Sequence, residues 1–292
     1  MLNTATVKAD QSVLKRLGTI VEGVPQTIGS GFTARHFSED MFAGRMDPLV
    51  MVDHFVMTAP TFDPHLHAGI SAVTALFEDS TGDFLNRDTL GHTIALKAGD
   101  LYWLAAASGA AHEEKPAAGA RIHALQIFVN LPDRLKRDPA RALHVPAHEV
   151  PVIEAQGRRV RVVLGRSGDT TGATGTPEEM SLLDGALTGN GSFTHPLPAD
   201  RHAWIYAAAG QLIVRVKGEQ CVLTAGSATT VSAGDKVEIT LESGISSHFV
   251  LMAAKPIREP FVKAGPLVMS TKDDVRQTLA EYAEGKFGRI RE

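Results

Sequence analysis

Short segments in which apolar and polar residues alternate dominate this chain. Residues 211–218 (QLIVRVKG) and 236–242 (KVEITLE) alternate most clearly, and residues 121–129 (RIHALQIFV) and 159–165 (RVRVVLG) also read as extended segments. A period of two places one face of a strand in an apolar core and the other face toward water. Glycine, aspartate and proline separate the segments at short intervals, which is typical of a β-sandwich or a β-barrel.

One helix is expected, close to the C-terminus. Thr271 lies three residues before Asp274, a spacing that resembles the capping box at the start of a helix, and Gly285 is a suitable stop. The helix would carry an apolar stripe made of Val275, Leu279 and Tyr282. Residues 165–179, which are rich in glycine and threonine, instead predict an exposed loop.

A faint internal repeat divides the chain into two halves. Residues 96–114 (LKAGDLYWLAAASGAAHEE) resemble residues 231–249 (VSAGDKVEITLESGISSHF), with Gly-Asp and Ser-Gly pairs matched at an offset of 135 residues. Because this offset is close to half of 292 residues, it indicates a duplicated domain instead of an array of short repeats. We therefore expect two domains, residues 1–145 and residues 146–292.

Composition and charge argue against several classes of function. The net charge is -4, the pI is near 6.3, and no block of lysine and arginine forms a basic stripe, so direct nucleic-acid binding is not expected. Residues 1–18 lack the apolar centre of a signal peptide, and no apolar run is long enough to span a membrane. Cys221 is the only cysteine; it is expected to be a small buried apolar residue, and its lack of a disulfide partner fits a cytoplasmic location.

Two pairs of candidate metal ligands occur at the spacing of strand residues that share a face. His65 and His67 lie in PHLH, and His112 and Glu114 lie in HEE. Side chains at i and i+2 of a strand point to the same side, so two strands of one barrel would bring three imidazoles and a carboxylate together. This set suits one divalent ion, iron(II), manganese, nickel, copper or zinc, and can leave positions open for substrate or dioxygen. The alternative is that all four residues line a polar surface.

The second half does not repeat this set of ligands. The positions that correspond to them hold Asp200, His202 and His248, with Val250 in place of the glutamate. Because valine cannot coordinate a metal ion, we expect the second domain to be a barrel without a complete metal site. A residual site made of Asp200, His202 and His248 is the alternative.

The remaining histidines and two aromatic residues have simpler interpretations. His54 follows Asp53 in an apolar run and is expected to be a hydrogen-bonded structural residue. Five further histidines have no partner at ligand spacing, namely His92, His123, His144, His148 and His195. Tyr102 and Trp103 precede the HEE segment and are expected to pack in the core, unless one of them lines the cavity.

The motifs together resemble those of the pirin family, two-domain members of the cupin superfamily, over nearly the whole chain. The matching segments, in the family's order, are DPLVMVDHF (residues 47–55), PHLH (64–67), the Gly-Asp-x-x-Trp segment that ends in His-x-Glu (96–114), ALQIFVNLP (124–132) and residues 259–288. The resemblance implies an all-β fold of two cupin-type β-barrels, a bicupin, with a short C-terminal α-helix. It also implies one metal ion, usually iron, held in the first barrel by His65, His67, His112 and Glu114.

The sequence departs from the family pattern beside these ligands. The family commonly reads His-x-His-Arg-Gly-Phe-Glu, whereas this chain reads HLHAGIS, so Ala68, Ile70 and Ser71 replace the arginine, phenylalanine and glutamate. Asn86 stands where the family often has histidine. Residues around a metal site orient its ligands and tune the ion. Metal binding is therefore still expected, but quercetin as the substrate does not follow from the resemblance.

The sequence leaves three functions open. Some bacterial pirins cleave the flavonol quercetin with dioxygen, which implies a metal-dependent dioxygenase for flavonol-like or other enolic aromatic substrates, with Glu114 as both ligand and catalytic base. The animal member is a nuclear transcription co-regulator whose metal senses redox state, which implies a non-catalytic regulator that binds a partner protein. The third is a cupin isomerase or small-molecule binder. Whether the chain is an enzyme is not decided by its residues.

Overall fold

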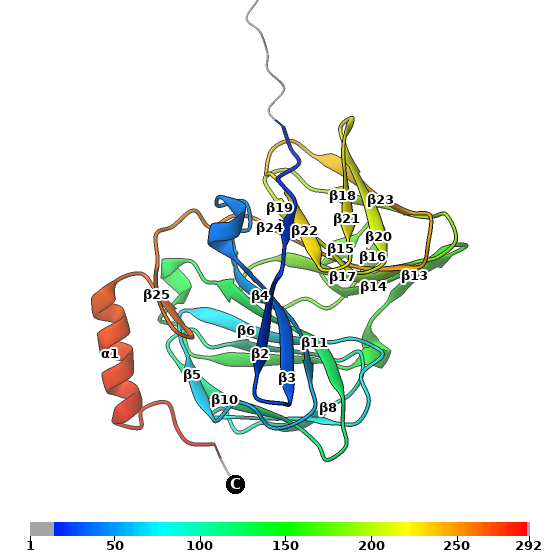
Figure 1. The fold of residues 1–292 in the computed structure, drawn as a ribbon. Coiled ribbons are helices and arrows are strands. Elements are labelled where there is room, and N and C mark those ends of the chain that lie inside the picture. Colours follow the sequence, from blue (N-terminus) through cyan, green and yellow to red (C-terminus); the bar gives the residue numbers. More distant parts are fainter. Residues whose placement is uncertain (1–14, 291–292) are drawn as a thin grey trace, which may run out of the picture.

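The alternating segments of the sequence form antiparallel sheets that close into two β-barrels, which confirms the all-β prediction. The structure is a computed structural model that describes residues 15–290, so the prediction made for the N-terminal segment falls largely outside the described residues. In Figure 1 the first barrel lies below the second, and the chain ends beside the first barrel. Within the described part, no helix has the length and apolar character needed to cross a bilayer.

The first barrel consists of a seven-stranded sheet and a four-stranded sheet. The larger sheet contains, in spatial order, β12 (Arg141–Val145), β9 (Leu101–Ala105), β6 (Ile70–Leu76), β11 (Ile122–Asn130), β4 (Leu49–Met57), β3 (Phe32–Ser38) and β2 (Val24–Ile28). The smaller sheet contains β5 (His65–His67), β10 (Ala110–Pro116), β7 (Phe84–Asp88) and β8 (Thr93–Leu96). Short 3₁₀ helices lie at Glu39–Phe42, Asp133–Leu135 and Ala147–Glu149.

The second barrel repeats this arrangement. Its seven-stranded sheet contains β1 (Val21–Glu22), β22 (Ser227–Val231), β19 (His202–Ala209), β24 (Ser247–Ala254), β17 (Met180–Leu187), β14 (Arg158–Leu164) and β13 (Val152–Ala155). Its four-stranded sheet contains β18 (Gly191–Leu197), β23 (Val237–Ser243), β20 (Gln211–Val216) and β21 (Glu219–Thr224). All four segments predicted as extended therefore form strands, namely β11, β14, β20 and β23.

The shared strand order shows that the two halves correspond, but at a different offset from the one read in the sequence. β9 corresponds to β22 and β10 to β23, because they occupy the same places in their sheets. The turn before β9 therefore corresponds to the turn at Ala225-Gly226 before β22, and not to Gly234-Asp235 before β23. The offset of 135 residues was wrong because it matched turns that lie one strand apart in the fold.

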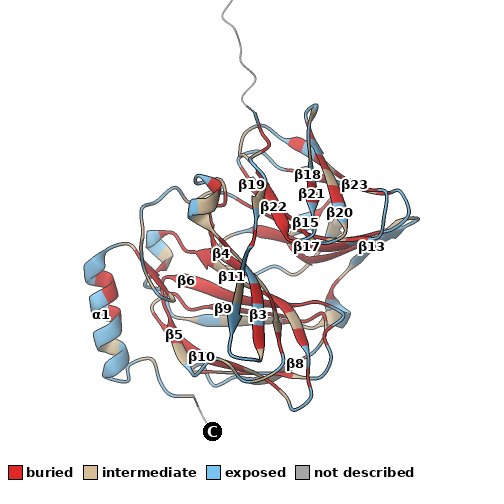
Figure 2. Ribbon diagram, in the orientation of Figure 1, coloured by how far each residue is buried: buried red, intermediate tan, exposed pale blue. Residues whose placement is uncertain are grey.

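Buried residues fill three places, the interior of each barrel and the space between the barrels (Figure 2). The first interior contains Phe55, Phe84 and Tyr102, and the second contains Phe193 and Phe249. The largest apolar cluster takes residues from both halves, including Phe37, Trp103 and Leu125 from the first and Trp204, Tyr206 and Val250 from the second. Because burial of apolar area is the main favourable contribution to folding, the barrels stabilise each other through this shared cluster.

The two halves also exchange segments. β1 pairs with β22 of the second barrel, with Val21 opposite Ala228. The chain returns after the second barrel as a ribbon, β25 (Val262–Ala264) and β26 (Leu267–Met269), followed by α1 (Lys272–Ala283). A parallel bridge from Ala68 to Leu267 places this ribbon against the first barrel. The proposed division at residue 145 is thus crossed by segments from both sides.

The C-terminal helix begins as predicted, but its apolar stripe is mostly exposed. The Thr271 hydroxyl accepts a hydrogen bond from the amide of Asp274, whose carboxylate accepts from the amide of Thr271, which completes the capping box. Val275 is buried, whereas Leu279 and Tyr282 are 49% and 38% exposed. The helix therefore contacts the barrel through its first two turns.

The loop predicted at residues 165–179 contains a short ribbon. β15 (Arg166–Ser167) pairs with β16 (Thr170–Thr171), and Ser167 is buried with its hydroxyl 3.0 Å from Nδ1 of His195. The rest of the segment is exposed or partly exposed. Cys221, predicted to be buried, is only partly buried; it packs against the apolar core of the second barrel.

A buried ion pair of the second barrel also contacts the first barrel. Arg161 of β14 is 3% exposed at its side chain, and its Nη1 lies 2.9 Å from Oδ2 of Asp184. The same guanidinium donates to the carbonyl of Gly99 in the first barrel. Asp184 is also paired with His248. Burial raises the pKa of Asp184, but the hydrogen bond and charge of His248, together with Arg161, outweigh burial and lower it.

We expect Arg161→Met to lower the free energy of unfolding by about 3 kcal/mol, because it leaves the buried Asp184 carboxylate without one of its two cationic partners. Arg159→Met on the same strand is the matched control: Arg159 pairs with the exposed Glu78 and is itself 42% exposed. Loss of that pair should cost less than about 1 kcal/mol. Chemical denaturation of the three proteins measures both effects, and equal losses in the two variants would contradict the assigned importance of Arg161.

Candidate metal centre

The three candidate histidine ligands come from two neighbouring strands of the four-stranded sheet. β10 pairs antiparallel with β5, with Ala110 opposite His67 and His112 opposite His65. His65 and His67 lie on one face of β5, and His112 lies on the same face of β10, as the i and i+2 spacing predicted. The pairing thus places one imidazole directly across the ladder from another and the third beside them.

The imidazole nitrogens of His65, His67 and His112 converge on one point. One ring nitrogen of each lies within 4.8 Å of the others, and Nε2 of His67 is 3.0 Å from Nε2 of His112. Nδ1 of His65 donates to the carbonyl of Asp63 at 2.9 Å, which fixes the proton on Nδ1 and leaves the Nε2 lone pair free. Among the described residues, this is the one group of three or more histidine, cysteine or acidic side chains close enough together to hold a metal ion.

The environment keeps the two inner histidines neutral. Burial, followed by repulsion from His112 and His65, lowers the pKa of His67 well below its usual range. Burial, followed by repulsion from His65, lowers the pKa of His112 to about 3. Nδ1 of each is buried without a hydrogen-bond partner. A metal ion binds the unprotonated imidazole, so three converging histidines, two of them kept neutral by burial, fit a divalent ion that accepts nitrogen ligands.

Glu114, the fourth predicted ligand, lies outside this nitrogen cluster. It shares the inward face of β10 with His112, and both carboxylate oxygens accept from the hydroxyl of Thr74, at 2.8 and 2.9 Å. Burial raises its pKa to about 7, against the hydrogen bond from Thr74, which lowers it. Oε1 of Gln126 lies 3.1 Å from the same Thr74 hydroxyl oxygen. Its role as a ligand remains a prediction.

All four residues line one cavity of about 170 Å³ in the first barrel. The rest of its wall is mainly apolar and consists of Phe32, Phe55, Phe62, Phe84, Phe128, Met51 and Met57, with Asp53 and Gln126 as further polar groups. Phe128 packs edge-on against His67, with ring centroids 5.1 Å apart. Sites for small molecules are commonly apolar cavities with a few polar groups that fix orientation. The cavity therefore has the character of a small-molecule site, with the histidines and Glu114 among its polar groups.

The residues that depart from the family pattern lie outside this cavity wall. Ala68 packs with Leu267 and Met269 of the C-terminal ribbon, and Ile70 packs with Val50 and Val268. Ser71 and Asn86 are buried, and their polar side-chain atoms have no hydrogen-bond partner. Asn86 is the cross-strand neighbour of Glu114. The departures thus change what surrounds the ligands and leave the wall of the cavity unaltered.

The shared strand order identifies the residues of the second barrel that correspond to the candidate ligands. His195 and Leu197 of β18 correspond to His65 and His67, and Ile239 and Leu241 of β23 correspond to His112 and Glu114. The positions read from the sequence, Asp200, His202, His248 and Val250, were therefore wrong. Three of the four true counterparts are apolar, so the expectation that the second barrel lacks a complete set agrees with the described residues.

His54 and His123 make hydrogen bonds outside the cavity. His54 lies 2.6 Å from the hydroxyl of Tyr206 and 2.6 Å from Nε2 of His123, which confirms its structural role. His123 in turn contacts Asp79. Tyr102 packs inside the first barrel and Trp103 packs in the cluster between the barrels, so neither lines the cavity.

Sequence reasoning missed three polar residues that support the site. Thr74 bonds the carboxylate of Glu114, and Gln126 contacts Thr74 in turn. Lys136 is a buried lysine whose amine donates to the carbonyl of Gly69, two residues after His67. A signal existed for Thr74, which is a hydroxyl within the otherwise apolar run AVTAL. Gln126 and Lys136 had no such signal, because Thr74 lies 52 residues from Gln126, and Gly69 and Val268 lie 67 and 132 residues from Lys136.

Comparison with known proteins agrees with this fold. The Pirin family model matches residues 24–129, and the model of the Pirin C-terminal cupin domain matches residues 182–288. Human pirin is 29% identical over 244 residues, which cover 83% of each chain. A Pseudomonas aeruginosa protein described as a candidate quercetin 2,3-dioxygenase is 31% identical over 276 residues, covering 90% of this chain and 94% of that protein.

A solved structure shows the same architecture. The crystal structure of quercetin 2,3-dioxygenase from Acinetobacter baumannii superposes with a TM-score of 0.82 at 26% sequence identity, and the match covers 94% of this chain and 98% of that chain. Both halves of the chain thus match pirin domains, in the order that the motifs predicted. The chain belongs to the pirin family and is a bicupin.

Proposed function

We propose that this pirin is a metal-dependent dioxygenase of flavonol-like or other enolic aromatic substrates. The observation that carries the proposal is the convergence of three histidines on an apolar cavity that also holds a buried carboxylate. The relatives described as quercetin 2,3-dioxygenases support this class of substrate. A cytoplasmic location, expected from the composition, belongs to the same proposal.

His65, His67, His112 and Glu114 would hold one divalent ion, with iron(II) as the first candidate and manganese, nickel, copper or zinc as alternatives. The ion would supply Lewis acidity and a template for substrate and dioxygen. The phenylalanine and methionine side chains would bind the aromatic rings and exclude water. Glu114 would take the proton of the reacting hydroxyl, and Thr74 would hold its carboxylate in place.

A second candidate function is a regulator whose metal state alters its surface toward a partner protein. The observation that favours it is that the strand carrying His65 and His67 packs directly against the C-terminal ribbon. The following helix exposes Leu279 and Tyr282. Pull-down experiments with and without a chelator separate the two functions: a partner retained in one metal state without turnover favours regulation, and turnover without a partner favours catalysis.

The metal content of purified protein should be about one ion per chain, because the first barrel alone has the complete set of ligands. His112→Ala should remove most of this metal, since it deletes one of the three converging nitrogens. His195→Ala, at the position of the second barrel that corresponds to His65, should leave it unchanged. Elemental analysis measures the content, after thermal melts have shown that both variants fold. Two ions per chain, or metal loss in folded His195→Ala, would contradict the assignment.

Iron-loaded protein should consume oxygen when given quercetin or a related member of a panel of catechols and enediols. Glu114→Gln should reduce the rate about 100-fold or more, because it removes the proposed base. Glu113→Gln is the matched control, since the neighbouring carboxylate faces away from the cavity and pairs with Arg87 and Lys115. An oxygen electrode gives both rates. No uptake with any compound in the panel, or equal rates in the two variants, would reject catalysis by this site.

A further inference from the structure

The strand that carries two of the three candidate histidine ligands has little support from its own sheet. β5 is three residues long and lies at the edge of the four-stranded sheet, where β10 is its one strand partner. Leu66, between the two histidines, points away from the cavity and is buried. A strand this short cannot fix its own position, so whatever covers Leu66 also holds His65 and His67.

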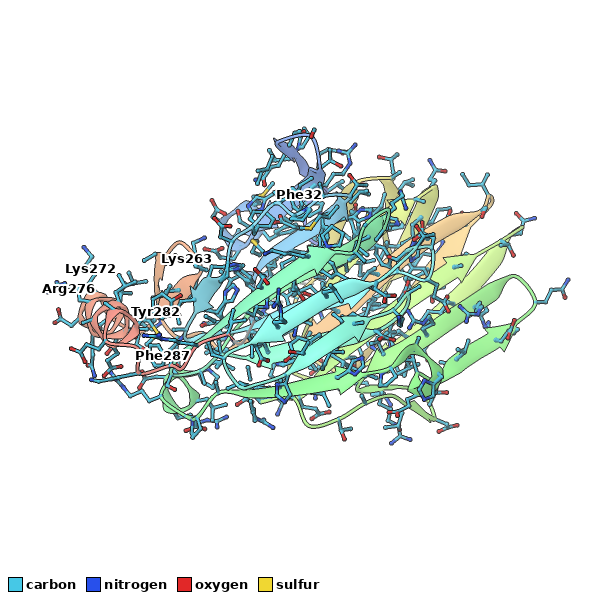
Figure 3. The ribbon with its side chains drawn as sticks, turned by 90° about the horizontal axis from the view of Figure 1, so that it is seen from below. Phe32, Lys263, Lys272, Arg276, Tyr282 and Phe287 are labelled. Atoms are coloured by element: carbon cyan, nitrogen blue, oxygen red, sulfur yellow. The ribbon has the colours of Figure 1, made fainter. Side chains whose placement is uncertain are left out.

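The cover is the C-terminal arm, which we define as residues 262–288. Leu66 and Ala68 form a cluster with Leu267, Met269 and Val275 of the arm, and Phe287 packs against it. The amide of Val268 donates to the carbonyl of Ala68 at 3.0 Å, within the parallel bridge between Ala68 and Leu267. Figure 3 shows α1 at the edge of the molecule, with Lys272 and Arg276 on its outer side and Phe287 between the helix and the first barrel.

A buried lysine joins the arm to the backbone that follows the histidines. Lys136 is 2% exposed, and its Nζ donates to the carbonyl of Gly69 at 2.8 Å, to the carbonyl of Val268 at 2.7 Å and to Oδ1 of Asn130 at 2.6 Å. All three ammonium protons are thus used. One partner belongs to the loop after His67 and one belongs to the arm, so a single side chain sets the distance between them.

The backbones meet closely at this point. Gly69 has a positive φ of 72°, and a Cβ at this position would lie 1.9 Å from the carbonyl oxygen of Val268. No other residue fits there without moving the arm or the loop. The same Val268 carbonyl accepts from Lys136. The loop after the histidines, the arm and the ammonium group therefore form one contact, and none of the three can move alone.

We propose that the C-terminal arm is the outer support of the metal centre and that Lys136 is the positioning residue that couples the two; this rests on the metal role proposed above. The coupling is reciprocal, because any contact that favours the ligand geometry must itself be favoured when the ion binds. Metal binding in the first barrel therefore tightens the arm, and release of the arm weakens metal binding. Because α1 is part of the arm and one face of it is exposed, metal binding also changes the mobility of this part of the molecular surface.

The first test is the affinity for nickel(II), measured by titration calorimetry of metal-free protein. Lys136→Met should weaken it about tenfold or more, the usual effect of removing a group that orients a metal ligand. Lys263→Met is the matched control, because Lys263 also joins the arm to the first barrel, through an ion pair with Glu39, but its side chain is 42% exposed. Unchanged affinity in folded Lys136→Met would overturn the proposal.

General loss of stability is separated from positioning by a third variant. Leu223→Ala removes an apolar side chain from the core of the second barrel, far from the arm contact, and should lower the melting temperature while nickel affinity is kept. If it weakens nickel binding as much as Lys136→Met does, the effect is one of overall stability and the proposal fails.

The second test follows the arm itself by amide hydrogen exchange. In the wild type, nickel should slow exchange in residues 262–283, and in Lys136→Met this protection should be lost or much reduced. Exchange in the arm that is indifferent to nickel in the wild type would overturn the coupling. A wild-type protein that binds no nickel would instead defeat the proposed metal function, so the two failures are distinguishable.

Discussion

The antiparallel pairing of β5 with β10 is the constraint on which the candidate metal centre depends. The ladder brings His65, His67 and His112 together only in one register, with His112 opposite His65. A slip of one residue would turn both histidines of β5 to the outer face and Leu66 into the cavity. Since β5 has three residues, the register cannot be set by its own hydrogen bonds. Burial of Leu66 on one side and of the imidazoles on the other fixes it.

The second barrel shows what the same framework becomes without ligands. Leu197, Ile239 and Leu241 occupy the positions of His67, His112 and Glu114, and they fill the interior as part of an apolar core. This barrel therefore acts as a support: it shares the largest buried cluster with the first barrel and provides the C-terminal arm. The first barrel keeps a cavity with buried polar groups, which costs stability, whereas apolar side chains occupy the corresponding positions of the second.

The sequence predicted the local features of this molecule and missed the distant ones. The period of two located the strands, and the spacing of His65, His67, His112 and Glu114 placed them in one cavity, because side-chain direction is a property of each strand alone. The correspondence between halves was misjudged, since similar Gly-Asp turns precede strands at different places in the two sheets. Val275, Leu279 and Tyr282 read as one apolar stripe, yet of these three residues only Val275 is buried. The partners of Lys136 are up to 132 residues away, so no pattern could indicate them.

Two of the departures from the family pattern, Ala68 and Ile70, are explained by their packing against the C-terminal arm. Ala68 is fully buried against the arm, so the arginine that the family commonly has there could not be accommodated without moving Leu267. Ile70 is likewise buried with Val268. These residues touch the support of the ligands and leave the phenylalanine and methionine wall of the cavity intact. Under the function proposed above, the cavity wall would select the aromatic substrate, and the packing of the arm behind β5 would tune the metal ion.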